Sequence, residues 1–124
     1  MRRRTLEILQ WLGLLVGALV WAAQHVVGFG VAEVQCSPGG AHFGISNDVW
    51  QASLMAVAAV AIVGAEAAAV TVFFATRPTS YEAEPPPSRI RFFAIAAMVA
   101  NVIFLMIVLL NGVGSIVNIP CRQS

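Results

Sequence analysis

Three continuous apolar runs, at about residues 8–32, 49–75 and 92–118, constrain what this chain can fold into more than any other feature. Each run exceeds the roughly 20 residues that a helix needs to cross a hydrocarbon core about 30 Å thick. The runs do not alternate apolar with polar residues as barrel strands do. Charged residues make up 10% of the chain, against roughly 25% in soluble domains. We therefore predict an all-α, single transmembrane domain over 1–124 with three transmembrane helices.

Arginine sets the expected orientation, because all seven basic residues of the chain are arginines. Six of the seven lie on one side of the predicted spans: Arg2, Arg3, Arg4, Arg77, Arg89 and Arg91. Only Arg122 lies on the other side. Short cytoplasmic flanks of membrane helices are enriched in Lys and Arg. We therefore predict a cytoplasmic N-terminus, an outer loop at 33–48, a cytoplasmic loop at 76–91 and an outside C-terminus.

A cleaved signal peptide is the alternative explanation for the first run. Arginines followed by an apolar stretch are typical of such peptides, but their apolar core is only about 7 to 15 residues long. The run at 8–32 is longer, so we expect it to remain as a membrane span.

Cys36 and Cys121 are the only two cysteines, and the expected topology places both of them outside. In an oxidising compartment they can form a disulfide that ties the first span to the third. We predict that disulfide. Two free thiols or a metal pair remain as alternatives, although two cysteines without neighbouring ligands do not complete a tetrahedral site.

Small residues in the first two runs indicate close helix packing. Gly13 and Gly17 form a GxxxG pair, a spacing that lets two helices approach closely. The second run is rich in alanine, including Ala52 and Ala56, so small side chains occur on nearly every face. We expect these positions to pack against other helices of this chain or of another subunit.

Glu66 is the polar residue that most needs an explanation, because a carboxylate deep in hydrocarbon is costly unless it is neutral, paired or wet. Counting from the inner ends of the runs places Glu66, Asn101 and the Val16-Gly17 region in one layer. A protonated Glu66 bonded to Asn101 or to a neighbouring subunit is the structural interpretation. A proton-handling carboxylate is the functional one. The third interpretation is a shift of the helix end that exposes Glu66 to water.

His25 and Asn111 are expected near the outer interface. A histidine in a span is a potential haem or copper ligand, but no second histidine lies at the same depth in another run. We predict an interfacial, hydrogen-bonding His25 instead. The sequence has no phosphate-binding loop, nucleophile–base pair or metal-ligand cluster, so we expect no catalytic residue and no metal or cofactor bound by this chain alone.

The ends of the second span have local signals. Asn47 or Asp48 is expected to cap its start, and Pro78 is expected to end it near Thr76. The segment that follows, at 76–91, is polar and rich in proline, so we predict an extended, mobile linker there.

Several short motifs occur in a characteristic order: an entry to span one at Trp11–Gly17, then Trp21 and His25, then Cys36, with Arg91–Ala94 opening the last span and Ile116–Cys121 closing the chain. This order resembles small three-span membrane proteins that are encoded with bacterial haem-copper cytochrome c oxidase. The longer segment at 36–50 departs from that pattern.

The resemblance implies a non-catalytic accessory subunit of a respiratory complex in the bacterial cytoplasmic membrane, either a cytochrome c oxidase or a quinol-oxidase supercomplex. Haem and copper would then belong to larger partner subunits, with lipid or quinone contacting the helices and no nucleic acid involved. Two alternatives come from other classes. One is a small homo-oligomeric transporter or proton channel that uses Glu66, and the other is an assembly factor that leaves the mature oxidase.

Overall fold

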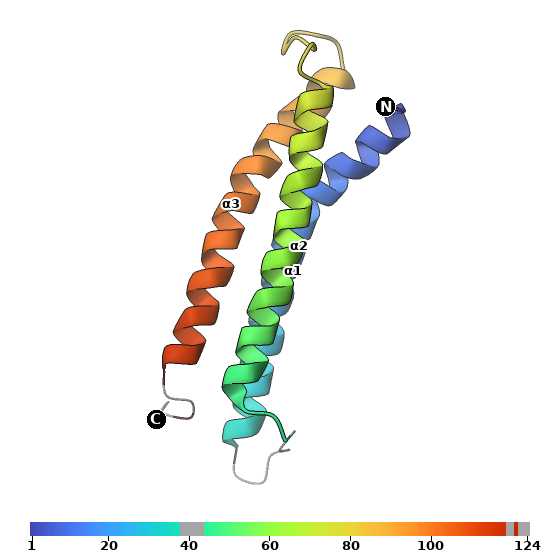
Figure 1. Cartoon of the computed structure of the whole chain (residues 1–124). Coiled ribbons are helices and arrows are strands. Elements are labelled where there is room, and N and C mark those ends of the chain that lie inside the picture. The colour runs from blue at the N-terminus through green and yellow to red at the C-terminus, as the bar shows by residue number, and fades with distance from the viewer. Residues whose placement is uncertain (38–43, 119–120, 122–124) are drawn as a thin grey trace.

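The chain forms three long helices in a computed structural model that describes residues 1–37, 44–118 and 121. They are α1 (Arg3–Cys36), α2 (Asn47–Ala75) and α3 (Pro87–Val117), and α2 runs antiparallel to the other two (Figure 1). Each helix packs against both others. All three are long and apolar enough to cross a membrane, which confirms the all-α class and the three candidate spans.

The two ends of the bundle differ chemically, and we name them by their residues. The arginine end contains the starts of α1 and α3 and the loop between α2 and α3, and it carries the six arginines described above. The disulfide end contains the last residue of α1, the start of α2 and Cys121. The predicted bond between Cys36 and Cys121 is present there, with the two Cα atoms 5.1 Å apart. Arg122 lies outside the described residues.

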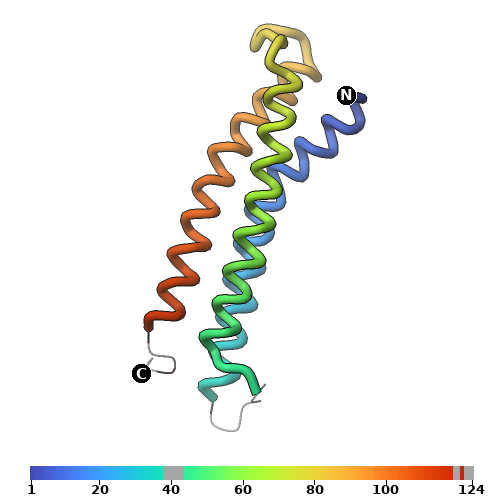
Figure 2. The backbone as a smooth tube through the Cα atoms, in the orientation of Figure 1, coloured from blue at the N-terminus to red at the C-terminus, as the bar shows by residue number. Residues whose placement is uncertain are grey.

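Buried positions recur along each helix in steps of three, four or seven residues. They are Gln10, Gly13, Gly17, Gln24 and Gly28 in α1; Gln51, Ala58, Ile62, Ala65, Ala69 and Val72 in α2; and Ile90, Ala94, Ala97, Asn101, Val108 and Gly112 in α3. A mean step of about 3.5 residues is the repeat of helices that pack at a shallow, left-handed angle. We call these positions the seam. Figure 2 shows α3 diverging from the other two helices toward the disulfide end, and the start of α1 leaning away from them at the arginine end.

All three helices begin before their apolar runs, because the polar residues at their starts are also helical. Arg3 pairs with Glu7 at 3.0 Å, one turn apart, within the first turns of α1. Pro87 begins α3, where its missing N–H costs nothing. Ser46 caps α2 by accepting a hydrogen bond from the Val49 N–H at 3.4 Å. The prediction of Asn47 or Asp48 as the cap was therefore wrong by one or two residues.

The segment at 76–86 is a series of turns and not the extended linker that its composition predicts. α2 ends at Ala75, and Thr76 is its C-cap residue. The guanidinium of Arg91 donates to the carbonyl oxygens of Arg77, at 2.9 Å, and of Thr79, and it lies 4.4 Å from the centre of the Tyr81 ring. One arginine of α3 thus holds the loop against the arginine end, since charged donors form strong hydrogen bonds with carbonyls.

Candidate functional site

The interior of the bundle is built in layers that alternate in polarity. Nearest the arginine end is an apolar layer of Val72, Ile90 and Ala94. The next layer contains the small and polar groups of Gly13, Ala69 and Asn101. A second apolar layer follows, which we call the apolar plug: Ala58, Ile62 and Val108, with Trp21 and Phe104 packed against it. Beyond the plug lies a polar cavity at the disulfide end.

The middle layer brings the three helices together through glycine. A Cβ built on Gly13 would lie 3.1 Å from the backbone nitrogen of Ala69, so α1 and α2 touch almost backbone to backbone. A Cβ on Gly17 would collide with the Asn101 Oδ1 atom and would lie 3.4 Å from the Phe104 ring. The two glycines singled out in the sequence are therefore both seam residues that seat the neighbouring helices.

Asn101 is 1% exposed, and its Nδ2 donates to the Gly13 carbonyl oxygen at 2.9 Å. The expected hydrogen bond between Glu66 and Asn101 is absent from the described residues. The reason is angular: Glu66 follows the seam residue Ala65 by one position, which turns its side chain about 100° away from the seam. Glu66 shares a stripe with Phe73, seven residues on, which packs against the apolar layer of Ile90 and Ala94.

Asn101→Ala is expected to destabilise the bundle by about 1 kcal/mol, because it removes an interhelical hydrogen bond and leaves a cavity between α1 and α3. Thermal unfolding in detergent measures this. Ser115→Ala is the control, because the Ser115 hydroxyl bonds only to the Asn111 carbonyl one turn back on its own helix. Equal unfolding temperatures for the two variants would show that the Asn101 bond contributes nothing.

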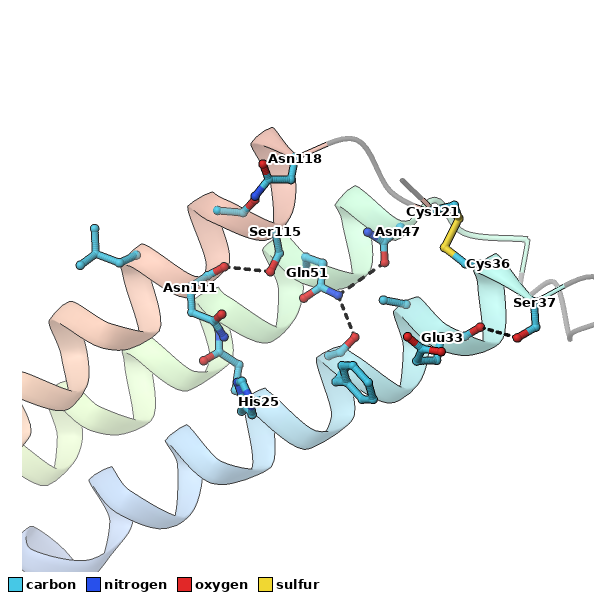
Figure 3. A pocket seen from close by; sticks show the side chains of 16 residues that line it. His25, Glu33, Cys36, Ser37, Asn47, Gln51, Asn111, Ser115, Asn118 and Cys121 are labelled. Carbon is cyan, nitrogen blue, oxygen red and sulfur yellow. Dashed lines mark hydrogen bonds between the residues drawn. A yellow bond between two sulfur atoms is a disulfide. The ribbon is translucent and has the colours of Figure 1, made fainter. Parts of the chain in front are cut away.

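A polar cavity of about 600 Å³ lies at the disulfide end. It lies between α1 and α3, with the start of α2 behind it. Figure 3 shows His25 of α1 and Asn111 of α3 at its deep end, and the disulfide at its opposite, outer end. Glu33 lies near that outer end. The disulfide therefore links α1 to the end of α3 across the mouth of this cavity.

Two glutamines that the sequence analysis did not select form the inner wall. The Gln51 amide donates to the Gly28 carbonyl oxygen at 3.0 Å and to Asn47 Oδ1 at 3.4 Å. The Gln24 amide donates to the Val108 carbonyl oxygen at 3.4 Å. A Cβ on Gly28 would lie 2.9 Å from the Gln51 Oε1 atom, so a larger residue there would displace the Gln51 amide. The spacing of about 3.5 residues between buried positions, in α1 for Gln24 and in α2 for Gln51, was the signal that could have identified them.

His25 is exposed and lies at the cavity wall with its ring stacked on Trp21, the two ring centres 6.3 Å apart. Asn111 is half-buried and lines the same cavity. The structure thus brings these two predicted residues to one site. Within residues 1–37, 44–118 and 121, no three His, Cys, Asp or Glu side chains gather where they could hold a metal ion.

The two alanines named in the sequence analysis, Ala52 and Ala56, are not seam residues. Ala56 is exposed on the outward face of α2, and Ala52 is only half-buried. The alanines that pack within this chain are seam residues, above all Ala69, which meets Gly13. Alanine content alone could not distinguish these faces, because alanine occurs all around α2.

The fold is a three-helix bundle whose helices are each long and apolar enough to span a membrane, with a polar cavity at one end that a disulfide bridges. Comparisons with protein-family models, curated proteins and solved structures find no match to this chain.

Proposed function

We propose that this chain is a non-catalytic accessory subunit of a larger complex in a bacterial cytoplasmic membrane, with the arginine end inside and the disulfide end outside. The order of its short motifs favours a respiratory complex, a cytochrome c oxidase or a quinol-oxidase supercomplex, whose larger subunits would carry haem and copper. The orientation rests on the arginine bias. An outside disulfide end would place Cys36 and Cys121 in an oxidising compartment.

The observation that carries this proposal is the outward face of α2. One exposed stripe, in steps of three and four residues, consists of small side chains apart from Val60: Ser53, Ala56, Val60, Gly64, Ala67 and Thr71. Larger apolar side chains are exposed elsewhere on α2, such as Val57, and on α1 and α3, such as Leu19 and Leu110. Small residues are enriched where membrane helices meet other helices, because they let backbones approach closely. The stripe therefore suits a helix of another subunit.

Glu66 lies on a different flank of α2 from this stripe. Its Oε2 atom is buried by this chain's own atoms and has no hydrogen-bond partner among the described residues. The case for a partner helix therefore depends on the stripe and not on Glu66.

The layered interior disfavours a channel through a single copy of the bundle. Between the level of Glu66 and the disulfide-end cavity lies the apolar plug, whose three seam residues are each at most 2% exposed. On the other side, the layer of Val72, Ile90 and Ala94 is equally buried. Ions do not cross such layers without water or polar groups. A channel would thus need a path between copies of the chain.

Gly64→Leu tests the accessory-subunit proposal, because a Cβ at Gly64 meets nothing within 4 Å in this chain. We expect the isolated variant to unfold at the same temperature as the wild type. The complex isolated through a tag on the variant, from native membranes in mild detergent, should contain at least about fivefold less haem per chain. Gly30→Leu is the control, since Gly30 of α1 also has open space around it. Wild-type chain that is recovered without larger subunits would contradict the proposal.

Two measurements separate the alternatives. Proton flux in liposomes that contain only the purified chain, lost in Glu66→Gln, would replace the accessory subunit with a transporter or proton channel. Recovery of the chain with immature oxidase but not with active oxidase would indicate an assembly factor. The accessory-subunit proposal predicts no flux and stoichiometric recovery with the active complex.

A further inference from the structure

One oxygen in the wall of the disulfide-end cavity lacks a donor. Gln24 is 5% exposed, and while its amide nitrogen donates to the Val108 carbonyl, its Oε1 atom is buried with no hydrogen-bond partner among the described residues. Gln24 lines the cavity. A buried amide oxygen normally has a partner, because leaving it unpaired costs its full desolvation energy. A bound molecule that supplies a donor would remove that cost.

The groups beside this oxygen restrict the donor. Asn111 follows Val108 by three residues, so it lies on the same face of α3 and its side chain leans back toward Val108, where Gln24 is bonded. No side-chain hydrogen bond of Asn111 is formed within the described residues. His25 lies at the same deep end (Figure 3). The site therefore offers one unpaired acceptor together with amide and imidazole groups that can donate, and a hydroxyl group matches both because it donates and accepts.

The charge of the cavity excludes a cation at this depth. Glu33 is the only Asp, Glu, Lys or Arg among the described lining residues, and it is nine residues from Gln24, about 13 Å along α1. One ammonium group cannot reach both side chains. At the deep end, where no carboxylate is available, a neutral donor avoids the cost of a charge near hydrocarbon.

The sides of the cavity are apolar and open. Phe29 of α1 is 61% exposed and Leu110 of α3 is 70% exposed, and both line the cavity. An apolar chain lying along these side chains would be in contact with the hydrocarbon around the bundle. A ligand that enters from the membrane would thus carry a polar head and an apolar tail.

We propose that the deep end of this cavity binds the hydroxyl head of a neutral, lipid-soluble amphiphile. The hydroxyl donates to Gln24 Oε1 and accepts from the Asn111 amide or the His25 ring, and the tail lies between Phe29 and Leu110. A quinol and a diacylglycerol carry the same chemistry. This site is independent of the accessory-subunit proposal, because it is complete within one chain.

Native mass spectrometry of the purified chain in detergent tests the site with three probes: a short-chain benzoquinol, the matching benzoquinone and dioctanoylglycerol. The quinone has the same tail and ring but no hydroxyl donor. We expect the quinol, the diacylglycerol or both to bind at least about tenfold more tightly than the quinone. Which of the two binds identifies the source of the hydroxyl. Equal affinity for quinol and quinone with no binding of diacylglycerol, or no binding of any probe, would overturn the proposal.

Substitutions in the cavity wall test where the hydroxyl head of the ligand binds. Gln24→Leu should weaken binding of the preferred probe about tenfold, and Glu33→Gln, at the outer end of the same cavity, should leave it within about twofold. Asn111→Leu, at a half-buried position, is the second test if Gln24→Leu lowers the unfolding temperature of the free chain. Unchanged affinity in both Gln24→Leu and Asn111→Leu would show that the head lies elsewhere.

Discussion

Gly13→Leu is expected to separate α1 from α2 and to destabilise the bundle by about 1–3 kcal/mol, the usual cost of overpacking a well-filled interior. A Cβ at this position already lies 3.1 Å from the Ala69 backbone nitrogen and 3.2 Å from its Cα. Backbone atoms cannot move aside as a flexible side chain can, so the whole helix must shift. The same shift removes the hydrogen bond from Asn101 to the Gly13 carbonyl oxygen.

The measurement is the midpoint of thermal unfolding in mild detergent, followed by near-UV circular dichroism of the tryptophans. Gly30→Leu is the matched control on the same helix, because the identical change there adds a side chain in open space. We expect the Gly13 variant alone to unfold at lower temperature. If both variants unfold at the same temperature as the wild type, α1 and α2 do not make the close contact at Gly13.

Removing the disulfide has the second large expected effect. Cys36 and Cys121 are 85 residues apart, and the chain-entropy relation gives on the order of 4 kcal/mol for a loop of that length. That relation describes an unfolded chain in water. In a bilayer or micelle the helices are already formed and held together, so the unlinked state has less entropy to gain. We therefore expect a loss of about 1–3 kcal/mol in Cys36→Ser/Cys121→Ser.

The effect should be local to the disulfide end, because α3 diverges from α1 there and the bond spans the mouth of the cavity. Hydrogen exchange should become faster in the last turns of α3 near Gly114 and remain slow near Asn101. Reductant should lower the unfolding temperature of the wild type and leave the double variant unchanged. A wild-type protein whose unfolding does not respond to reductant would show that the bond adds no stability.

The three candidate spans were predictable from the sequence because they follow from length and polarity alone. A helix needs a fixed number of apolar residues to cross hydrocarbon, and no other local structure satisfies the backbone there. The pairing of Cys36 with Cys121 was predictable for a similar reason, because two helices lie between them in the chain and an even number of crossings puts both cysteines on the same side. Both predictions depend on counting and not on side-chain geometry.

The partners of the polar groups were less predictable, because they depend on rotation about each helix axis. Depth counting placed Gly17 and Asn101 in one layer, and the structure brings them into contact. The same counting paired Glu66 with Asn101, which was wrong, since depth says nothing about the 100° between Ala65 and Glu66. The seam spacing in all three helices supplies the missing angle, and it also selects Gln24 and Gln51.

The prediction of an extended linker between α2 and α3 was wrong for a different reason. Proline and polar residues indicate a segment with no core of its own, and that part is correct. Its turns are fixed from outside the segment by the side chain of Arg91, which belongs to α3. A composition-based prediction treats the segment alone and cannot include such a donor.

The apolar plug has an electrical consequence. Polar, open cavities admit water and conduct the potential of the adjoining solution, whereas a layer such as Ala58, Ile62 and Val108 behaves as a thin dielectric. In an energised membrane the voltage would fall mainly between the plug and the arginine end, and little of it across the disulfide-end cavity. A molecule held beside Gln24 would then exchange with its surroundings at nearly constant voltage, and Glu66, on the far side of the plug, would lie within the field.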